Sequence, residues 1–229
     1  MPQTLLAMGA HYDDCVFGIP GILLQAIRKH YRVVILAMIG DYSNWAPIKG
    51  REKELIAGTK EISAGYGAEL RYLNFKSHCF EVNLENKRAV AEAVADVQPD
   101  IAFMLWRHDR HDDHVVASQL SEIALRQASP LLDNRPVKTP RRIYAYDNGP
   151  RHTIGFEPDT FVDITDDWPI AIDWLGRFMA LVRNEPYKPG TRDAAQQMKE
   201  SIASYRGKTC GVQFAEAIWS ADKYPRDIL

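Results

Sequence analysis

The chain has 229 residues, of which 46% are hydrophobic and 25% charged, and its formal net charge is -2. This balance is typical of a globular protein and excludes a disordered or fibrous chain, while the length suits one large α/β domain. The charge and the absence of a Lys/Arg run argue against a nucleic-acid partner, because such binding depends on phosphate contacts.

Short apolar runs alternate with segments of helical period along the first part of the chain. This alternation predicts β-α-β units and a mostly parallel sheet. The predicted strands lie at residues 4–8, 32–39, 69–75 and 100–105. The predicted helices lie at residues 20–29, 51–67 and 84–97, with a further helix from 111 to about 127.

The last third of the chain is less regular. Residues 127–142 are rich in proline and polar side chains and indicate a connection. Strands are predicted at 143–147 and 160–165, and two or three helices are predicted from residue 166 onward. Two of these helices are expected at 191–207 and 211–222. The fold class is therefore α/β, with a mostly parallel sheet flanked by helices in a single domain.

The lack of a recognisable targeting signal and the cysteine usage predict a cytoplasmic protein. No stretch reaches 18 consecutive apolar residues, so no membrane span is expected. The start MPQTLLAMGAHYDD lacks the basic and long apolar regions of a secretory signal. The cysteines Cys15, Cys79 and Cys210 are odd in number and widely spaced, which favours neither a disulfide framework nor a thiolate zinc site.

Two polar clusters follow two of the predicted strands. The segment His11 to Asp14 follows the first strand, and RHDRHDDH at 107–114 follows the strand at 100–105. In open α/β sheets, ligands bind at the carboxyl ends of the strands, so the two clusters are expected to meet. An imidazole and a carboxylate from one loop and an imidazole from the other would leave a position for water, which is the composition of a catalytic zinc site.

Such a site suits hydrolysis. A bound metal acidifies a water molecule and polarises a carbonyl group, and a general base and an oxyanion donor complete the machinery. Each cluster also has an ordinary structural interpretation, because aspartates after a strand often cap helices and histidines are often plain surface groups. Two such clusters at two strand ends favour the metal site.

The clusters resemble the signatures of the LmbE-like, or PIG-L, family of metal-dependent N-acetylglucosaminyl deacetylases. Residues 10–15 match its A-H-P-D-D-E motif, and residues 111–114 match its H-x-D-H motif. Further similarities occur at 51–54, 162–165 and 215–217. The resemblance runs over nearly the whole chain and implies a Rossmann-like fold and a single LmbE-like deacetylase domain over residues 1–229.

The resemblance also assigns roles to individual residues. It implies three metal ligands, which are His11, Asp14 and His114. It implies that Asp13 is the general base and that His111 stabilises the oxyanion and protonates the leaving amine. Asp113 would lie behind a histidine ligand and orient it, and Arg51 would contact the polar end of the substrate.

The implied activity is that of a zinc-dependent N-deacetylase, a hydrolase acting on a linear amide C–N bond. A metal-bound water would attack an N-acetylglucosamine-type amide and release acetate and an amine. Zinc is the family's usual metal, although nitrogen and oxygen ligands also suit Fe²⁺. The expected partner is a small N-acetylated sugar or glycoconjugate, and aromatic residues in the last third leave room for a homo-oligomer interface.

Two alternative functions stay open at this point. They are a deacylase of another N-acyl or ester substrate and a non-catalytic sugar-binding protein with a degenerate site.

Three positions depart from the family pattern. Tyr12 and Asp112 each replace a proline of the motifs, and Cys15 replaces a glutamate. We interpret Cys15 as a packing residue, and we expect the carboxylate of Asp112 to raise the pKa of His111.

Overall fold

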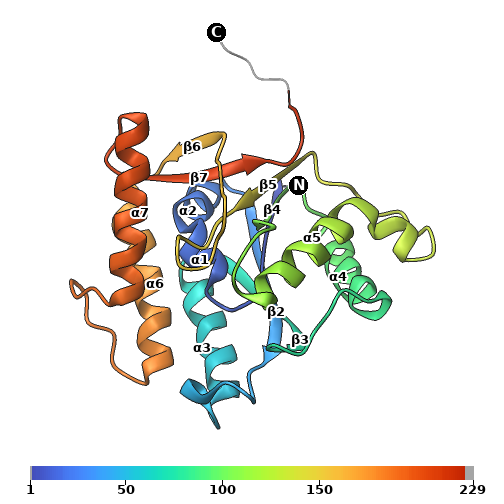
Figure 1. The fold of residues 1–229 in the computed structure, drawn as a ribbon, viewed down its shortest axis with the longest axis horizontal. Coiled ribbons are helices and arrows are strands. Elements are labelled where there is room, and N and C mark those ends of the chain that lie inside the picture. The colour runs from blue at the N-terminus through green and yellow to red at the C-terminus, as the bar shows by residue number, and fades with distance from the viewer. Residues whose placement is uncertain (1, 225–229) are drawn as a thin grey trace.

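The structure is a computed structural model that describes residues 2–224. Within these residues, seven strands form one sheet in the order β3-β2-β1-β4-β5-β7-β6 (Figure 1). The strands are β1 (Thr4–Gly9), β2 (Arg32–Asp41), β3 (Ala68–Lys76), β4 (Ile101–Leu105), β5 (Arg142–Tyr146), β6 (Thr160–Asp163) and β7 (Ala215–Ser220). Strands β1 to β5 pair in parallel, and β7 runs antiparallel to both β5 and β6. The predicted mostly parallel sheet is confirmed.

Helices cover both faces of the sheet in a single domain. They are α1 (Asp14–Gly18), α2 (Pro20–Arg28), the 3-10 helix η1 (Ala46–Ile48), α3 (Glu52–Gly65), α4 (Leu84–Val97), α5 (Asp112–Leu131), α6 (Trp168–Arg183) and α7 (Ala194–Cys210). Helices α4 and α5 pack together on one side, while α2, α3 and α6 pack on the other (Figure 1). All six residues of the central strand β1 are buried, as expected for a strand covered on both faces.

The C-terminal part corrects one prediction. The helix predicted at 211–222 is wrong, because this segment contains β7, which lies between β5 and β6. Its apolar spacing fits a helical period, but residues 215–218 pair with β6 and residues 218–220 pair with β5, so the segment forms a strand. Gly211, with φ 83°, ends α7 just before this strand.

Helix α5 extends further than predicted. It reaches Leu131 instead of ending near residue 127, so the first part of the predicted connection at 127–142 is helical. Gln127 has non-helical dihedral angles and Pro130 lies inside the helix, so the last turn follows a kink. Pro130 thus lies in the bent end of the helix, and residues 132–141 form the remaining connection to β5.

The strand order locates the natural binding edge of the sheet. The chain fills the sheet outward from β1 to β3 and then returns to place β4 on the other side of β1. Ligands bind at such a reversal point, outside the carboxyl ends of the strands. The loops that follow β1 and β4 carry the two polar clusters, so the topology brings them to one crevice.

Helix α7 is fastened to this framework by a buried ion pair. The Nζ of Lys199 lies 3.0 Å from Oε1 of Glu216 and donates a hydrogen bond of 2.8 Å to the carbonyl oxygen of Gly18. The same glutamate accepts hydrogen bonds from the N–H groups of Gly21 and Ile22 in the first turn of α2. Glu216 thus joins β7, α7 and α2.

Lys199→Met is expected to lower the free energy of unfolding by about 3–5 kcal/mol, because it leaves the buried carboxylate of Glu216 without its cation. Urea denaturation measures this change. Lys208→Met is the matched control, since Lys208 is an exposed lysine of the same helix, and its effect should stay within about 0.5 kcal/mol. Equal losses in the two variants would show that the ion pair does not tie α7 to the sheet.

None of the helices within residues 2–224 combines the length and the apolar character that crossing a lipid bilayer requires.

Candidate active site

The loop after β1 holds the carboxylate of Asp14 in one orientation. Oδ2 of Asp14 accepts hydrogen bonds from the N–H groups of Ala10 (2.7 Å) and His11 (2.8 Å), and Oδ1 accepts one from Asn148 Nδ2 (2.7 Å). Asp14 also packs over Gly9, where an added Cβ would lie only 2.8 Å from the Cβ of Asp14. The glycine that ends β1 therefore makes room for this carboxylate.

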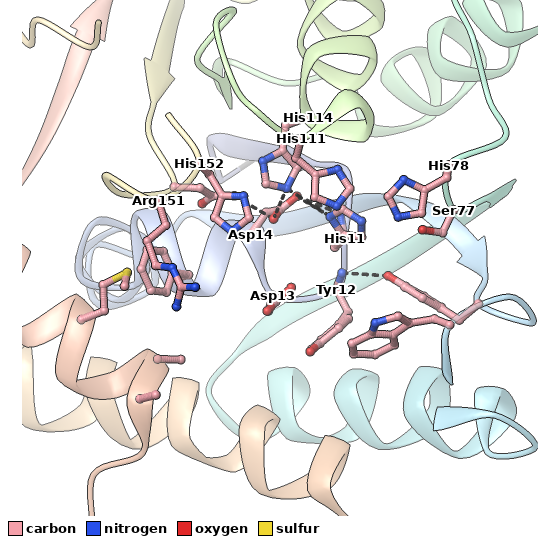
Figure 2. Close-up of a pocket in the computed structure, with 17 residues that line it drawn as sticks. His11, Tyr12, Asp13, Asp14, Ser77, His78, His111, His114, Arg151 and His152 are labelled. Carbon is pink, nitrogen blue, oxygen red and sulfur yellow. Dashed lines mark hydrogen bonds and ion pairs between the residues drawn. The ribbon is translucent and has the colours of Figure 1, made fainter. Parts of the chain in front are cut away.

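Three potential ligand atoms converge at the crevice (Figure 2). Nδ1 of His11 lies 3.2 Å from Nε2 of His114, which lies 3.2 Å from Oδ1 of Asp14. Nδ1 of His11 lies 3.6 Å from Oδ2 of Asp14. Ligands at about 2.0–2.2 Å from a tetrahedral metal lie about 3.3–3.6 Å from each other. The three predicted ligands are thus brought together at a spacing that fits a divalent metal.

Carboxylates stand behind both histidines. Nε2 of His11 lies 3.2 Å from Oδ2 of Asp113, and Nδ1 of His114 lies 3.1 Å from Oδ2 of Asp109. The second contact is an ion pair without the alignment of a regular hydrogen bond. Asp113 thus lies against a histidine, as predicted, but the histidine belongs to the other motif. Asp109, which the sequence did not single out, takes the corresponding place behind His114.

The carboxylates favour positive charge where the ligand atoms converge. Burial lowers the pKa of His11, but hydrogen bonds to Asp113 and Asp14 outweigh burial and raise this pKa to about 9. Burial is likewise outweighed at His114, where Asp14 and Asp109 raise the pKa to about 10. Burial raises the pKa of Asp14, but His114 and His11 hold it well below its usual range. A cation is therefore electrostatically stabilised here.

Two other trios of side chains also lie close enough to hold a metal. They are His11, His111 and Asp113, and Asp109, His114 and His152. Both use the carboxylates that already contact the second nitrogens of His11 and His114. The trio of His11, Asp14 and His114 leaves those carboxylates free to orient the imidazoles, which is the usual arrangement around metal-binding histidines.

Asp13 points a free carboxylate into the same space (Figure 2). It occupies the N-cap position of α1, yet its side chain makes no cap hydrogen bond. The carboxylate has no hydrogen bond or ion pair to another of the residues 2–224. Burial and the neighbouring charge of Asp14 raise its pKa to about 6. The capping interpretation of this aspartate is therefore wrong, and its carboxylate remains free to accept a proton.

His111 is the N-cap residue of α5, and its ring lies between two other imidazole rings. Its ring centroid is 4.7 Å from that of His114 and 4.9 Å from that of His78, and both pairs are stacked. Nδ1 of His111 accepts a hydrogen bond from the N–H of Asp113 (3.3 Å), so Nε2 carries the proton of the neutral ring. His111 is thus arranged as a hydrogen-bond donor.

The expected effect of Asp112 on His111 is not found. Burial and the positive charges of His11 and His114 lower the pKa of His111 to about 4. Asp112 is exposed in the first turn of α5 and is not among the groups that shift this pKa. The prediction of a raised pKa for His111 was wrong. It considered Asp112, which is adjacent in sequence, whereas the imidazoles of His11 and His114 lie closer in space.

A cavity of about 510 Å³ contains the site, and loops after all five parallel strands contribute to its wall. Tyr12, Tyr42 and Trp45 form an aromatic side, with the ring centroids of Tyr12 and Trp45 6.2 Å apart. Arg151 and Met198 also line the cavity. The volume lies within the range of cavities that bind small organic ligands.

Several residues of this site were missed by the sequence reasoning. Asn148, Arg151 and His152 follow β5, which was itself predicted. The rule that polar residues after a parallel strand reach the binding edge applies to them as well. The sequence alone does not show that β5 runs parallel to β4, so it does not place these three residues at the binding edge.

Arg51 does not contact the cavity. Its Nη2 donates hydrogen bonds to Glu54 (2.7 Å) and to the carbonyl oxygen of Leu181 (2.9 Å), and its Nη1 donates to the carbonyl oxygen of Val182 (3.3 Å). The guanidinium thus links α3 to the last turn of α6. Its donors are thus used within the protein, and the substrate contact expected of Arg51 stays a prediction.

Cys15 packs in the core, as its interpretation required. Only 1% of the residue is exposed, and its Sγ lies 3.1 Å from the hydroxyl of Tyr146, which donates to the carbonyl oxygen of Met8. Burial raises the pKa of the thiol. Cys15 does not line the cavity. The replacement of the family glutamate by this cysteine therefore leaves the cluster of His11, Asp14 and His114 intact.

The fold and the site together define an α/β protein with a histidine and aspartate cluster at the carboxyl edge of its sheet. The model of the PIG-L family, described as GlcNAc-PI de-N-acetylase, matches residues 6–125. The chain belongs to the PIG-L, or LmbE-like, family, as its two motifs predicted.

Solved structures with the same fold include enzymes of two kinds. GalB, the 4-carboxy-2-hydroxymuconate hydratase from Pseudomonas putida, has 17% identity and a TM-score of 0.79, with 99% of each chain covered. The conserved protein TT1542 from Thermus thermophilus has 22% identity and a TM-score of 0.76, with 98% of this chain and 97% of its own covered. N,N'-diacetylchitobiose deacetylase from Pyrococcus horikoshii has 17% identity and a TM-score of 0.75, with 95% and 83% covered. At these identities the similarities establish the shared fold.

Proposed function

We propose that the chain is a metal-dependent deacetylase that hydrolyses an N-acetylglucosamine-type amide, and that residues 1–229 form one such domain. The observation that carries this proposal is the convergence of His11, Asp14 and His114 beside the free carboxylate of Asp13. Membership of the PIG-L family supports the reaction type.

The proposed metal ligands are His11, Asp14 and His114. Two imidazoles and a carboxylate suit Zn²⁺, and the same donors also accept Fe²⁺. When bound, the metal would act as a Lewis acid on the substrate carbonyl and would make a water molecule in the site more acidic.

The protein groups then handle the protons. Asp13 accepts a proton from the water that attacks the acetyl carbon, and the Nε2–H of His111 donates a hydrogen bond to the carbonyl oxygen. This hydrogen bond strengthens as negative charge develops on that oxygen. When the C–N bond breaks, Asp13 passes its proton to the amine nitrogen, and acetate and amine leave. Asp13 holds the proton taken from the water when the C–N bond breaks, so we assign the protonation of the amine to Asp13 rather than to His111.

Metal analysis paired with acetate release tests this function. Protein purified without chelator should contain a divalent metal and release acetate from members of a panel of N-acetylated sugars. Chelation should abolish the release, and Zn²⁺ or Fe²⁺ should restore it. Metal-loaded protein that releases no acetate from any N-acetylated compound would overturn the deacetylase. Absence of metal uptake would favour the degenerate sugar-binding site, against which the free Asp13 argues.

One observation favours a second candidate, a hydratase that adds water to an unsaturated carboxylic acid. Arg151 lines the cavity without a carboxylate partner among residues 2–224, and GalB, with its similar fold, is named for a carboxylated compound. Loss of ultraviolet absorbance by an unsaturated hydroxy-dicarboxylic acid, without acetate release from N-acetylated sugars, would favour the hydratase. Adding N-acyl amines and sugar esters to the panel covers the deacylase alternative.

The cytoplasmic location and the homo-oligomer stay predictions of the sequence. Light scattering on the purified protein tests the second of them.

A further inference from the structure

Arg151 places an unpaired positive charge in the cavity. Figure 2 shows its side chain directed toward the space in front of Asp13. Among residues 2–224, no side chain forms a hydrogen bond or ion pair with the guanidinium of Arg151. It does not pair even with Asp13, which lines the same cavity. Two opposite charges thus face one space and stay separate, which leaves both available to a ligand between them.

The turn that carries Arg151 is anchored on both sides. Oδ1 of Asp147 lies 2.5 Å from Nη2 of Arg206, which reaches the turn from α7, and Oδ2 of Asp147 accepts the N–H of Gly149. The N–H of Asn148 donates to Oγ1 of Thr153 (2.9 Å). These contacts fix the backbone before and after Arg151, and its side chain lines the cavity.

The wall of the cavity also includes apolar side chains. They are Phe17, Ala194, Ala195 and Met198. Arg151 is an exposed residue at the cavity, and a planar guanidinium forms charge-assisted hydrogen bonds with a carboxylate or phosphate. The two small alanines at the start of α7 leave room for such a group.

We propose that Arg151 binds an anionic group of the substrate, a carboxylate or a phosphate, while the scissile bond lies at Asp13 and the three ligand residues. This inference rests on the proposed function and specifies its substrate class. Arg151 attracts the anionic group at one end of the cavity, while the free carboxylate of Asp13 marks the reacting end. The separated charges would therefore set the direction in which the substrate enters.

Binding of reaction products tests the inference without requiring turnover. Calorimetry on the zinc-loaded protein compares glucosamine 6-phosphate with glucosamine, and muramic acid with its methyl ester. We expect the charged member of at least one pair to bind about 10- to 100-fold more tightly, and we expect Arg151→Gln to remove most of this preference. The first pair reports a phosphate site and the second a carboxylate site.

Arg142→Gln is the matched control, because Arg142 is an exposed arginine at the start of β5, at the opposite edge of the sheet, and should leave the preference unchanged. Equal binding of charged and neutral members by the unmodified protein, or no binding of any of the four, would overturn the inference. An unchanged preference in Arg151→Gln would do the same. A preference that depends on Arg151, together with no acetate release from any substrate, would keep the anion site and remove the deacetylase.

Discussion

Asp13→Asn is expected to lower the turnover number for acetate release by about 10²- to 10⁴-fold, the usual contribution of a general base. Asparagine keeps the shape of the side chain but cannot accept the proton. Because no hydrogen bond joins this carboxylate to another of the residues 2–224, the substitution should leave the fold and the metal content unchanged. Turnover and bound metal are measured on the same preparation.

Asp112→Asn is the matched control for Asp13→Asn. It makes the same chemical change to an exposed aspartate of the second motif and should leave turnover unchanged. An Asp13→Asn protein with turnover close to that of the parent would remove the base from Asp13. Loss of metal in Asp13→Asn would instead make this residue a ligand.

His114→Ala is expected to lower the affinity for Zn²⁺ by more than about 100-fold, because it removes one of three protein ligands. Asp109→Asn should lower the affinity by about 10- to 100-fold, the usual effect of losing a carboxylate behind a histidine ligand. In the parent, affinity should fall as the pH is lowered, since the imidazoles bind metal only when deprotonated. Competition with a chromophoric chelator measures these affinities, and circular dichroism checks that each variant folds.

His152→Ala and His111→Ala separate the three possible ligand trios. The proposed trio of His11, Asp14 and His114 predicts that both variants keep the affinity of the parent. A large loss in His152→Ala would favour the trio with Asp109, and a large loss in His111→Ala would favour the trio with Asp113. Either result would contradict the proposed ligand set.

Local sequence patterns were sufficient to predict most of the fold. The apolar runs that became β1, β2 and β4 are buried along nearly their whole length, so their composition reflects their environment directly. The segment 211–222 failed because four consecutive buried residues satisfy a helical period and a central strand equally well. Only the space between β5 and β6 decides which structure forms there.

The sequence by itself determined the chemical content of the candidate site, because two polar clusters directly follow buried strands and match the two motifs of the PIG-L family. His11, Asp13, Asp14, His111 and His114 could therefore be named before their positions were known. Tertiary structure decided how they are partnered. Asp113 contacts His11, which is 102 residues away, and Asn148 orients Asp14, which is 134 residues away. Such contacts depend on the order and direction of the strands, and no local pattern encodes them. The free charge of Arg151 in the cavity follows from the same arrangement.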